Sequence, residues 1–187
     1  MRSVRCFIAV FLDPALRPQV VALQRHLAQS GADVKWVEPE NLHFTLKFLG
    51  DVEESRLEAL TRRLQACVGG VDAFELGLGA AGAFPRIQDP RVIWIGVSVG
   101  RQPFLTLASV VEETMKAEGF RGEGKGISPH LTIGRVRSGR NLHALADRLS
   151  SSAPLEGTMR VDTVQLVASE LASRGPMYSP VAIVSLS

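Results

Sequence analysis

A short motif, His-x-Thr, occurs twice in the chain and constrains its fold more than any other feature. "NLHFTLKFLG" contains His43 and Thr45, and "SPHLTIGR" contains His130 and Thr132. Each motif comes at nearly the same distance after an arginine that opens a strand-like apolar run. A repeat at fixed spacing is typical of a duplicated architecture. The spacing therefore predicts two similar α/β lobes related by an approximate two-fold axis.

Apolar patterning predicts the same order of elements in both halves: strand, helix, His-x-Thr strand, helix, strand. Asp13-Pro14 is typical of a helix start, and Phe104, Leu107 and Val111 recur at helical spacing. The halves are expected to span roughly residues 1–90 and 91–187, with "PRIQDP" as a loop between strands. A chain of 187 residues suits one domain built from both halves.

Composition excludes several classes of protein. Hydrophobic residues make up 45% and charged residues 21% of the chain, which is typical of a globular domain. The apolar run "CFIAVFL" is too short to cross a bilayer, so we expect neither export nor a membrane anchor. Cys6 and Cys67 read as buried reduced thiols, which favours a cytoplasmic protein.

A mildly basic balance permits an anionic ligand without predicting a DNA-binding surface. The net charge is +2 and the sequence pI is about 8.8. Several cations gather in the sequence around the second motif, where their field would favour an anion. They are Arg121, Lys125, Arg135, Arg137 and Arg140.

Strand geometry predicts how each motif presents its polar groups. Successive side chains of a strand point to opposite faces, so His43, Thr45 and Lys47 are expected on one face and Phe48 on the other. The histidine and threonine of the second motif share a face in the same way. A lone strand histidine is more often a hydrogen-bonded core residue, but two matched pairs favour function. His26 and His143 lie in helical segments without such partners.

Two histidines that face each other across a groove suit a reaction that takes one proton and gives another. An imidazole with a pKa near 6.5 does either at neutral pH. Phosphodiester cleavage is such a reaction, and nearby hydroxyls can hold the phosphate oxygens. It needs no metal, and the chain has no Cys/His cluster or His-x-x-x-His spacing typical of zinc. A module that binds nucleotide or RNA without turnover remains an alternative.

The blocks "VKWVEPENLHFTLKFLGDV", "FPRIQDPRVIWIGV", "SPHLTIGRV" and "GPMYSPV" carry a family resemblance that runs nearly end to end. The chain resembles the RNA 2′,3′-cyclic phosphodiesterases, also called 2′-5′ RNA ligases or LigT-like proteins, of the two-histidine phosphoesterase superfamily. The resemblance implies a bilobal α/β (α+β) fold in which two antiparallel sheets line a central cleft, with helices outside. It implies hydrolysis of a 2′,3′-cyclic phosphate RNA end to a 2′-phosphate, with possible reversible ligation.

The resemblance also assigns roles to residues. His130 is implied as the base that activates water and His43 as the acid that protonates the departing 3′ oxygen. Thr45, Thr132 and Arg135 are implied to bind the phosphate.

For the nucleoside, the resemblance suggests that Phe7 and Phe48 line its part of the cleft, and a core role is an equal alternative for Phe48. We expect a monomer that uses no cofactor or metal and acts on RNA ends. A small cyclic nucleotide, such as an ADP-ribose cyclic phosphate, is an alternative substrate.

Overall fold

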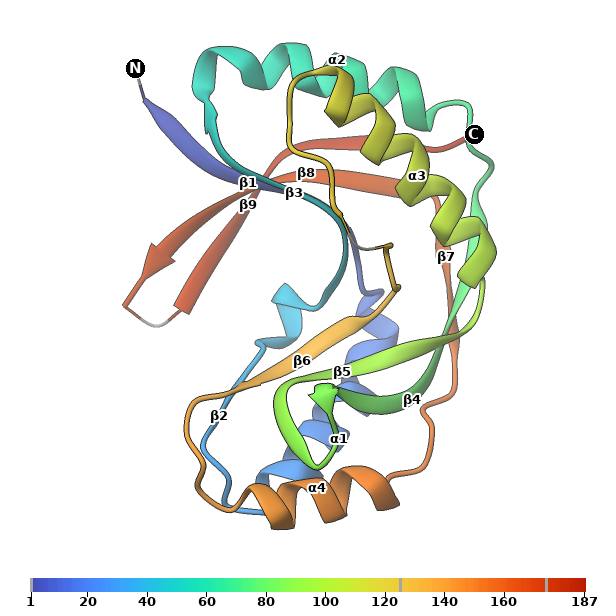
Figure 1. Ribbon diagram of the computed structural model, residues 1–187. Helices are drawn as coiled ribbons and strands as arrows, with labels where there is room; N and C mark the ends of the chain where they lie inside the picture. Colours follow the sequence, from blue (N-terminus) through green and yellow to red (C-terminus); the bar gives the residue numbers. More distant parts are fainter. Residues whose placement is uncertain (1, 125, 174) are drawn as a thin grey trace.

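The computed structural model describes residues 2–124, 126–173 and 175–187. Within these residues the chain forms nine strands, four α-helices and three 3-10 helices (Figure 1). The strands are β1 (Ser3–Phe11), β2 (Val34–Trp36), β3 (His43–Glu53), β4 (Phe74–Arg86), β5 (Asp89–Val99), β6 (Leu131–Val136), β7 (Thr158–Val161), β8 (Thr163–Ala172) and β9 (Gly175–Ser185). The helices are α1 (Arg17–Ala28), α2 (Leu57–Val68), α3 (Arg101–Ala117) and α4 (Leu142–Ser151), and the 3-10 helices are η1 (Pro14–Leu16), η2 (Pro39–Asn41) and η3 (Glu54–Arg56).

The described strands form a single curled antiparallel sheet with two lobes. Its order is β7-β4-β5-β6-β3-β1-β8-β9, and β2 pairs with β6 beside this path. The link between the lobes is the contact of β3 with β6, where Phe44 pairs with Leu131. The two sheets expected from the sequence are therefore joined into one at this point. The α/β order of elements predicted for each half is confirmed.

Helices cover the outside of the curled sheet, and two of them pack on the lobe opposite the strand that precedes them. Helices α2 and α3 lie over the lobe of β1 and β3, whereas α1 and α4 lie over the lobe of β5 and β6 (Figure 1). Helix α1 follows β1 but packs against β6, and α3 follows β5 but packs against β3. Each lobe is thus covered by a helix that comes from a strand of the other lobe.

The boundary between the halves falls inside a β-hairpin. Strand β4 continues to Arg86 and β5 starts at Asp89, and these two residues pair. The loop predicted for "PRIQDP" is therefore shorter than expected, because the ladder between the strands extends almost to the turn.

The apolar faces predicted for the helices form the core. In α3 the predicted residues Phe104, Leu107 and Val111 are fully buried, and Met115, one turn further along, is buried with them. The Phe104 ring meets the Phe44 ring edge to face, with centroids 6.0 Å apart, so α3 packs directly behind the first His-x-Thr motif. At the predicted helix start, the Asp13 carboxylate accepts a hydrogen bond from the amide of Ala15, in η1.

Two further sequence expectations concern the cysteines and the membrane. Both cysteines are free thiols; Cys6 is buried as expected, whereas Cys67 is only partly buried. Burial raises the pKa of the Cys6 thiol to about 11. In the described part of the chain, no helix combines the length and the apolar character needed to cross a bilayer.

The alternation of side chains along β3 breaks at Leu46, which corrects one prediction. Thr45 and Lys47 pair with adjacent residues of β1, so Leu46 is an extra residue and forms a β-bulge. Beyond the bulge the faces exchange. The Lys47 side chain turns into the core and is 1% exposed, whereas Phe48 turns outward and is 59% exposed. Lys47 therefore does not share a face with His43, and Phe48 does.

The buried ammonium of Lys47 joins three elements. Its Nζ donates to the Arg121 carbonyl oxygen at 2.6 Å and lies 2.7 Å from Glu112 Oε2 in α3. The other oxygen of Glu112 accepts from the backbone amide of Glu123 at 2.8 Å. Burial raises the pKa of Glu112, but these two donors outweigh it and the net pKa is lowered. The pair thereby holds the backbone at Arg121 and Glu123, after the end of α3.

We expect Lys47→Met to lower the free energy of unfolding by about 3–5 kcal/mol, because the change leaves the carboxylate of Glu112 largely buried without its cation. Urea denaturation followed by circular dichroism measures the effect. The matched control is Lys116→Met, since Lys116 pairs with Glu113 at the surface and such pairs contribute about 1 kcal/mol or less. Equal losses in the two variants would contradict a special role for the buried pair.

Candidate active site

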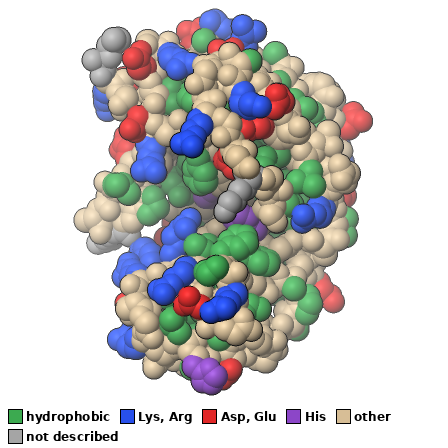
Figure 2. Space-filling model, in the orientation of Figure 1, with side chains coloured by type: hydrophobic (Ala, Val, Ile, Leu, Met, Phe, Trp, Pro, Cys, Tyr) green, Lys and Arg blue, Asp and Glu red, His purple; other side chains and the backbone are tan. Residues whose placement is uncertain are grey.

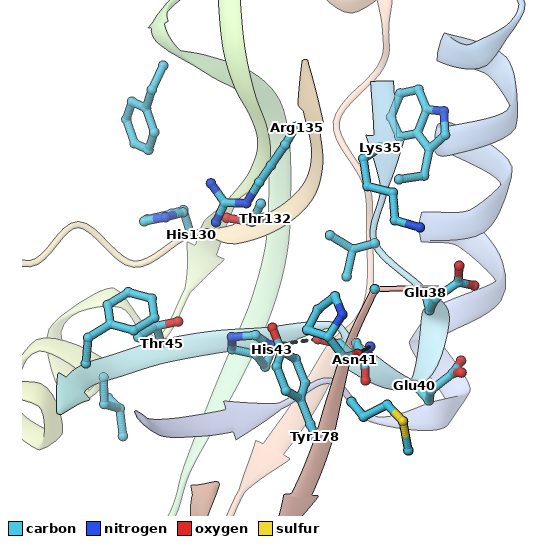
Figure 3. Close-up of a pocket in the computed structure, with 18 of the residues that line it drawn as sticks. Lys35, Glu38, Glu40, Asn41, His43, Thr45, His130, Thr132, Arg135 and Tyr178 are labelled. Carbon is cyan, nitrogen blue, oxygen red and sulfur yellow. Dashed lines mark hydrogen bonds between the residues drawn. The ribbon is translucent and has the colours of Figure 1, made fainter. Parts of the chain in front are cut away.

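The two His-x-Thr motifs lie side by side because β3 and β6 pair antiparallel at Phe44 and Leu131. Both of these side chains are buried, so the residues that flank them face the other way. In an antiparallel pair the flanking residues run in opposite directions, and the histidine of each motif therefore lies next to the threonine of the other. Figure 3 shows the four side chains around one cavity: His43, Thr45, His130 and Thr132.

Each imidazole is held by the backbone two residues before it. The Nδ1 atom of His43 lies 2.6 Å from the Asn41 carbonyl oxygen, and Nδ1 of His130 lies 2.7 Å from the Ser128 carbonyl oxygen. A carbonyl oxygen only accepts, so Nδ1 carries the proton in both rings. Each neutral ring then presents its unprotonated Nε2 as the free nitrogen. The two sites are equivalent in this respect, as the repeat predicts.

The cavity between the lobes has a volume of about 1070 Å³. Figure 2 shows the molecule hollowed at this place, with histidine side chains inside the hollow and Lys and Arg side chains along one rim. Besides the two motifs, its walls come from β2, η2, the start of β9 and the segment before β6. They include Lys35, Trp36, Glu38, Glu40, Asn41, Phe48, Phe84, Arg135, Met177 and Tyr178.

Aromatic rings surround His43. The centroids of Phe7 and Phe11, both in β1, lie 4.9 and 5.4 Å from the centroid of the imidazole. Tyr178 in β9 meets His43 edge to face at 5.5 Å. These contacts fix the plane of the ring and remove water from around it. Tyr178 also lines the cavity, and burial raises the pKa of its phenol, so the hydroxyl stays protonated.

The electrostatic environment lowers the pKa of His43. Burial is the largest cause, and the charges of Arg135 and His130 add to it, whereas the hydrogen bond to the Asn41 carbonyl opposes it. His43 is therefore neutral at neutral pH in the protein by itself. The influence of Arg135 on this pKa indicates that its guanidinium lies near the imidazole of His43.

A second β-bulge brings Arg135 to the cavity. Thr132 pairs with Trp94 and Gly134 pairs with the adjacent Ile93, so Ile133 is the extra residue. Arg135 thereby comes to the same side of β6 as Thr132, and Figure 3 shows both side chains at the cavity. A cavity with two imidazoles, two hydroxyls and a guanidinium can hold a phosphate and exchange protons with it.

Phe7 and Phe48 have different positions. Phe48 lines the cavity, because the bulge at Leu46 turns it outward, and the alternative of a core position for Phe48 is wrong. Phe7 is 4% exposed, packs behind His43 and does not line the cavity. Sequence reasoning did not single out Tyr178. It is the only tyrosine of the chain, but its position beside His43 depends on the pairing of β8 with β9, which the sequence does not specify.

The basic cluster predicted from the sequence is mostly not part of the cavity. Arg135 is the one member that lines it among the described residues, and Lys125 lies outside them. Arg140 instead donates to the Gly31 carbonyl oxygen and joins two loops. No three His, Cys, Asp or Glu side chains of the described ranges lie together as ligands for a metal ion.

Comparison with known proteins places the chain in a family. The family model described as "LigT like Phosphoesterase" matches residues 10–94 and again residues 95–178. This fold with its paired motifs is that of a phosphoesterase. The chain belongs to the LigT-like phosphoesterase family, which confirms the resemblance seen in the sequence.

Relatives cover nearly the whole chain. A protein of Methanothermobacter thermautotrophicus named RNA 2′,3′-cyclic phosphodiesterase is 41% identical, over 98% of this chain and 100% of its own. One of Archaeoglobus fulgidus with the same name is 37% identical, over 96% and 99%. Among solved structures, TT0787 of Thermus thermophilus has a TM-score of 0.81 at 27% identity and covers 97% of both chains. E. coli LigT in its apo form has a TM-score of 0.79 at 25% identity, over 100% of this chain and 99% of its own.

We expect the pKa of His43, measured by NMR titration of its ring resonances, to lie below the ordinary value of about 6.5. The substitution Arg135→Gln should raise this pKa, because it removes a cation that disfavours the imidazolium. Arg137→Gln serves as the control, since this exposed arginine of the same segment does not line the cavity. If Arg135→Gln leaves the His43 titration where it was, the electrostatic account of the site is wrong.

Proposed function

We propose that the protein opens 2′,3′-cyclic phosphate ends of RNA to 2′-phosphates by metal-independent acid and base catalysis. The observation that carries the proposal is the pair of imidazoles that line one cavity, each held by the backbone through Nδ1, with hydroxyls and a guanidinium around them. The names of the relatives support this substrate.

In the proposed reaction His130 Nε2 takes a proton from water as the water oxygen attacks phosphorus. The bond from phosphorus to the 3′ oxygen breaks, and the imidazolium of His43 gives its proton to that oxygen. The product is a 2′-phosphate beside a free 3′-hydroxyl. Thr45, Thr132 and Arg135 bind the non-bridging oxygens, where negative charge is concentrated in the transition state.

The acid role of His43 requires that the substrate raise its pKa. Without substrate, burial keeps the ring neutral, so Nε2 has no proton to give. A bound cyclic phosphate brings one negative charge beside the ring and partly cancels the charge of Arg135. Substrate binding and protonation of His43 therefore support each other.

The size of the cavity supports an RNA end rather than a mononucleotide. Its volume of about 1070 Å³ exceeds the range of about 300–1,000 Å³ typical of small-molecule sites. Lys35, which lines the cavity and pairs in register with Arg135, supplies a second cation for a neighbouring phosphate. Binding of a longer substrate should accordingly weaken as salt rises.

The catalytic roles are tested with an oligonucleotide that ends in a 2′,3′-cyclic phosphate, incubated in EDTA and resolved by chromatography. We expect turnover by the unmodified protein, and losses on the order of 10²- to 10⁴-fold for His43→Ala and His130→Ala. His143→Ala is the control, because His143 lies on the surface of α4.

Other outcomes would contradict specific parts of the proposal. No turnover by the unmodified protein would leave a binding module, and turnover only without EDTA would contradict the metal-independent mechanism. Faster opening of an ADP-ribose cyclic phosphate than of the oligonucleotide would favour a small cyclic nucleotide as substrate. Near-normal rates in either histidine variant would overturn the role of that residue.

The pH dependence tests whether substrate binding raises the pKa of His43. The acid must be protonated and the base neutral, so the profile is bell-shaped and its limbs belong to the pair of imidazoles. The profile of kcat/KM reports the free enzyme, where burial lowers the pKa of His43, and the profile of kcat reports the complex, where the phosphate raises it. We therefore expect the profile of kcat to be displaced to higher pH than that of kcat/KM. Coincident profiles would contradict the rise in the pKa of His43 that its acid role requires.

A further inference from the structure

A second, smaller cavity lies beside His130. Its volume is about 240 Å³, and Phe84, Ser128 and His130 line both this cavity and the larger one. Its other lining residues include Trp94, Gly96 and Arg101. Because His130 lines both cavities, a group bound in the smaller one lies next to the imidazole that the proposed reaction uses as its base.

The backbone register places the wall of this cavity on the same face as the phosphate-binding hydroxyl. Gly82, Trp94 and Thr132 pair in a row across β4, β5 and β6. Paired residues project to the same face of a sheet, so the indole of Trp94 lies on the face that carries Thr132. The ring rests on the backbone of Gly82, where an added Cβ would collide with it.

Three rings in contact connect this row of residues to the imidazole proposed as the catalytic base. They belong to Trp94, Phe84 and His130. The Phe84 ring lies 5.2 Å from Trp94, tilted by 38°, and meets His130 edge to face at 5.1 Å. Phe84 is 38% exposed, although it is a large apolar side chain. Exposed aromatic rings next to a phosphate site are the usual platform on which unpaired bases stack.

A cation completes the smaller cavity. Arg101, the first residue of α3, is exposed and has no ion pair or hydrogen bond among the residues that the structure describes. No carboxylate belongs to the described wall of this cavity. Aromatic rings can stack on a nucleobase, and an unpaired guanidinium can bind the phosphate attached to its nucleoside. Hydrolysis by water needs neither contact.

We propose that the smaller cavity is the acceptor site for the 5′-terminal nucleoside of a second RNA that carries a free 5′-hydroxyl. This proposal rests on the proposed function. The group that attacks phosphorus must enter opposite the leaving 3′ oxygen, hence from the side of His130. Water needs no pocket there, but a nucleoside does. Its base stacks on Trp94 and Phe84, and Arg101 binds the phosphate on its 3′ side.

The resulting reaction is a transesterification with no further reactant. His130 Nε2 takes the proton of the 5′-hydroxyl, and the 5′ oxygen forms a bond to phosphorus. The bond from phosphorus to the 3′ oxygen breaks, and that oxygen receives the proton of His43. The product is a 2′-5′ phosphodiester. Opening by water and joining to RNA thus differ only in what occupies the smaller cavity.

The experiment measures both products in one reaction. An oligonucleotide with a 2′,3′-cyclic phosphate end is mixed in EDTA with a 5′-hydroxyl dinucleotide below saturation, and the 2′-phosphate and the joined product are quantified. We expect Trp94→Ala to lower joining roughly 5- to 150-fold, the range for loss of one stacked base, and Trp94→Phe to retain most of it. Arg101→Gln should lower joining about tenfold, as loss of one charged contact predicts. In these variants, opening by water should stay within about twofold of the normal rate.

The control is Arg91→Gln, since Arg91 lies outside this cavity. Both products should form in this variant within about twofold of their normal rates.

The outcomes separate this proposal from the proposed function. If the unmodified protein opens the cyclic end but never joins the dinucleotide, or if joining and opening fall together in Arg101→Gln, the acceptor site is wrong and hydrolysis stands. If the cyclic end is not opened at all, the proposed function itself fails. A 5′-deoxy dinucleotide tests the site without any variant. It should inhibit joining in competition with the acceptor, and a failure to compete would overturn the acceptor site.

Discussion

The antiparallel contact between β3 and β6 is the constraint on which the site depends. It consists of one pair of residues, Phe44 and Leu131, both buried against the helices behind them. The side chains that flank this pair have to face the opposite way, into the space between the lobes. A single contact between the two motif strands therefore brings both motifs to one cavity. The crossing helices α1 and α3 secure the contact, because each packs on the lobe opposite its own strand.

Desolvation determines the protonation state of His43. Rings from β1 and β9 enclose His43, and the cost of burying charge there keeps the imidazole neutral until an anion arrives. The hydrogen bonds from Nδ1 to backbone carbonyls fix which nitrogen is available on each ring. In the proposed reaction these groups are in place before the phosphate binds, which is the usual form of electrostatic preorganisation.

Irregular backbone is as important to this site as the regular strands. Bulges at Leu46 and Ile133 each insert one residue and exchange the faces beyond it. In β3 the exchange buries Lys47 against Glu112 and turns Phe48 to the cavity. In β6 it brings Arg135 beside Thr132. Strict alternation of side chains predicts neither exchange, because it assumes an unbroken ladder. The prediction that placed Lys47 on the face of His43 was wrong for this reason.

The sequence by itself determined the elements and the identity of the motifs. Apolar periodicity located the helices, and two His-x-Thr pairs at matched spacing predicted the duplication, because local patterns follow from the geometry of one helix or strand. Tertiary structure alone decided that the sheets join at Phe44 and Leu131, that Tyr178 comes to His43, and that most of the basic cluster stays away from the cavity. These contacts depend on strand pairing and bulges between distant segments, which no local pattern encodes.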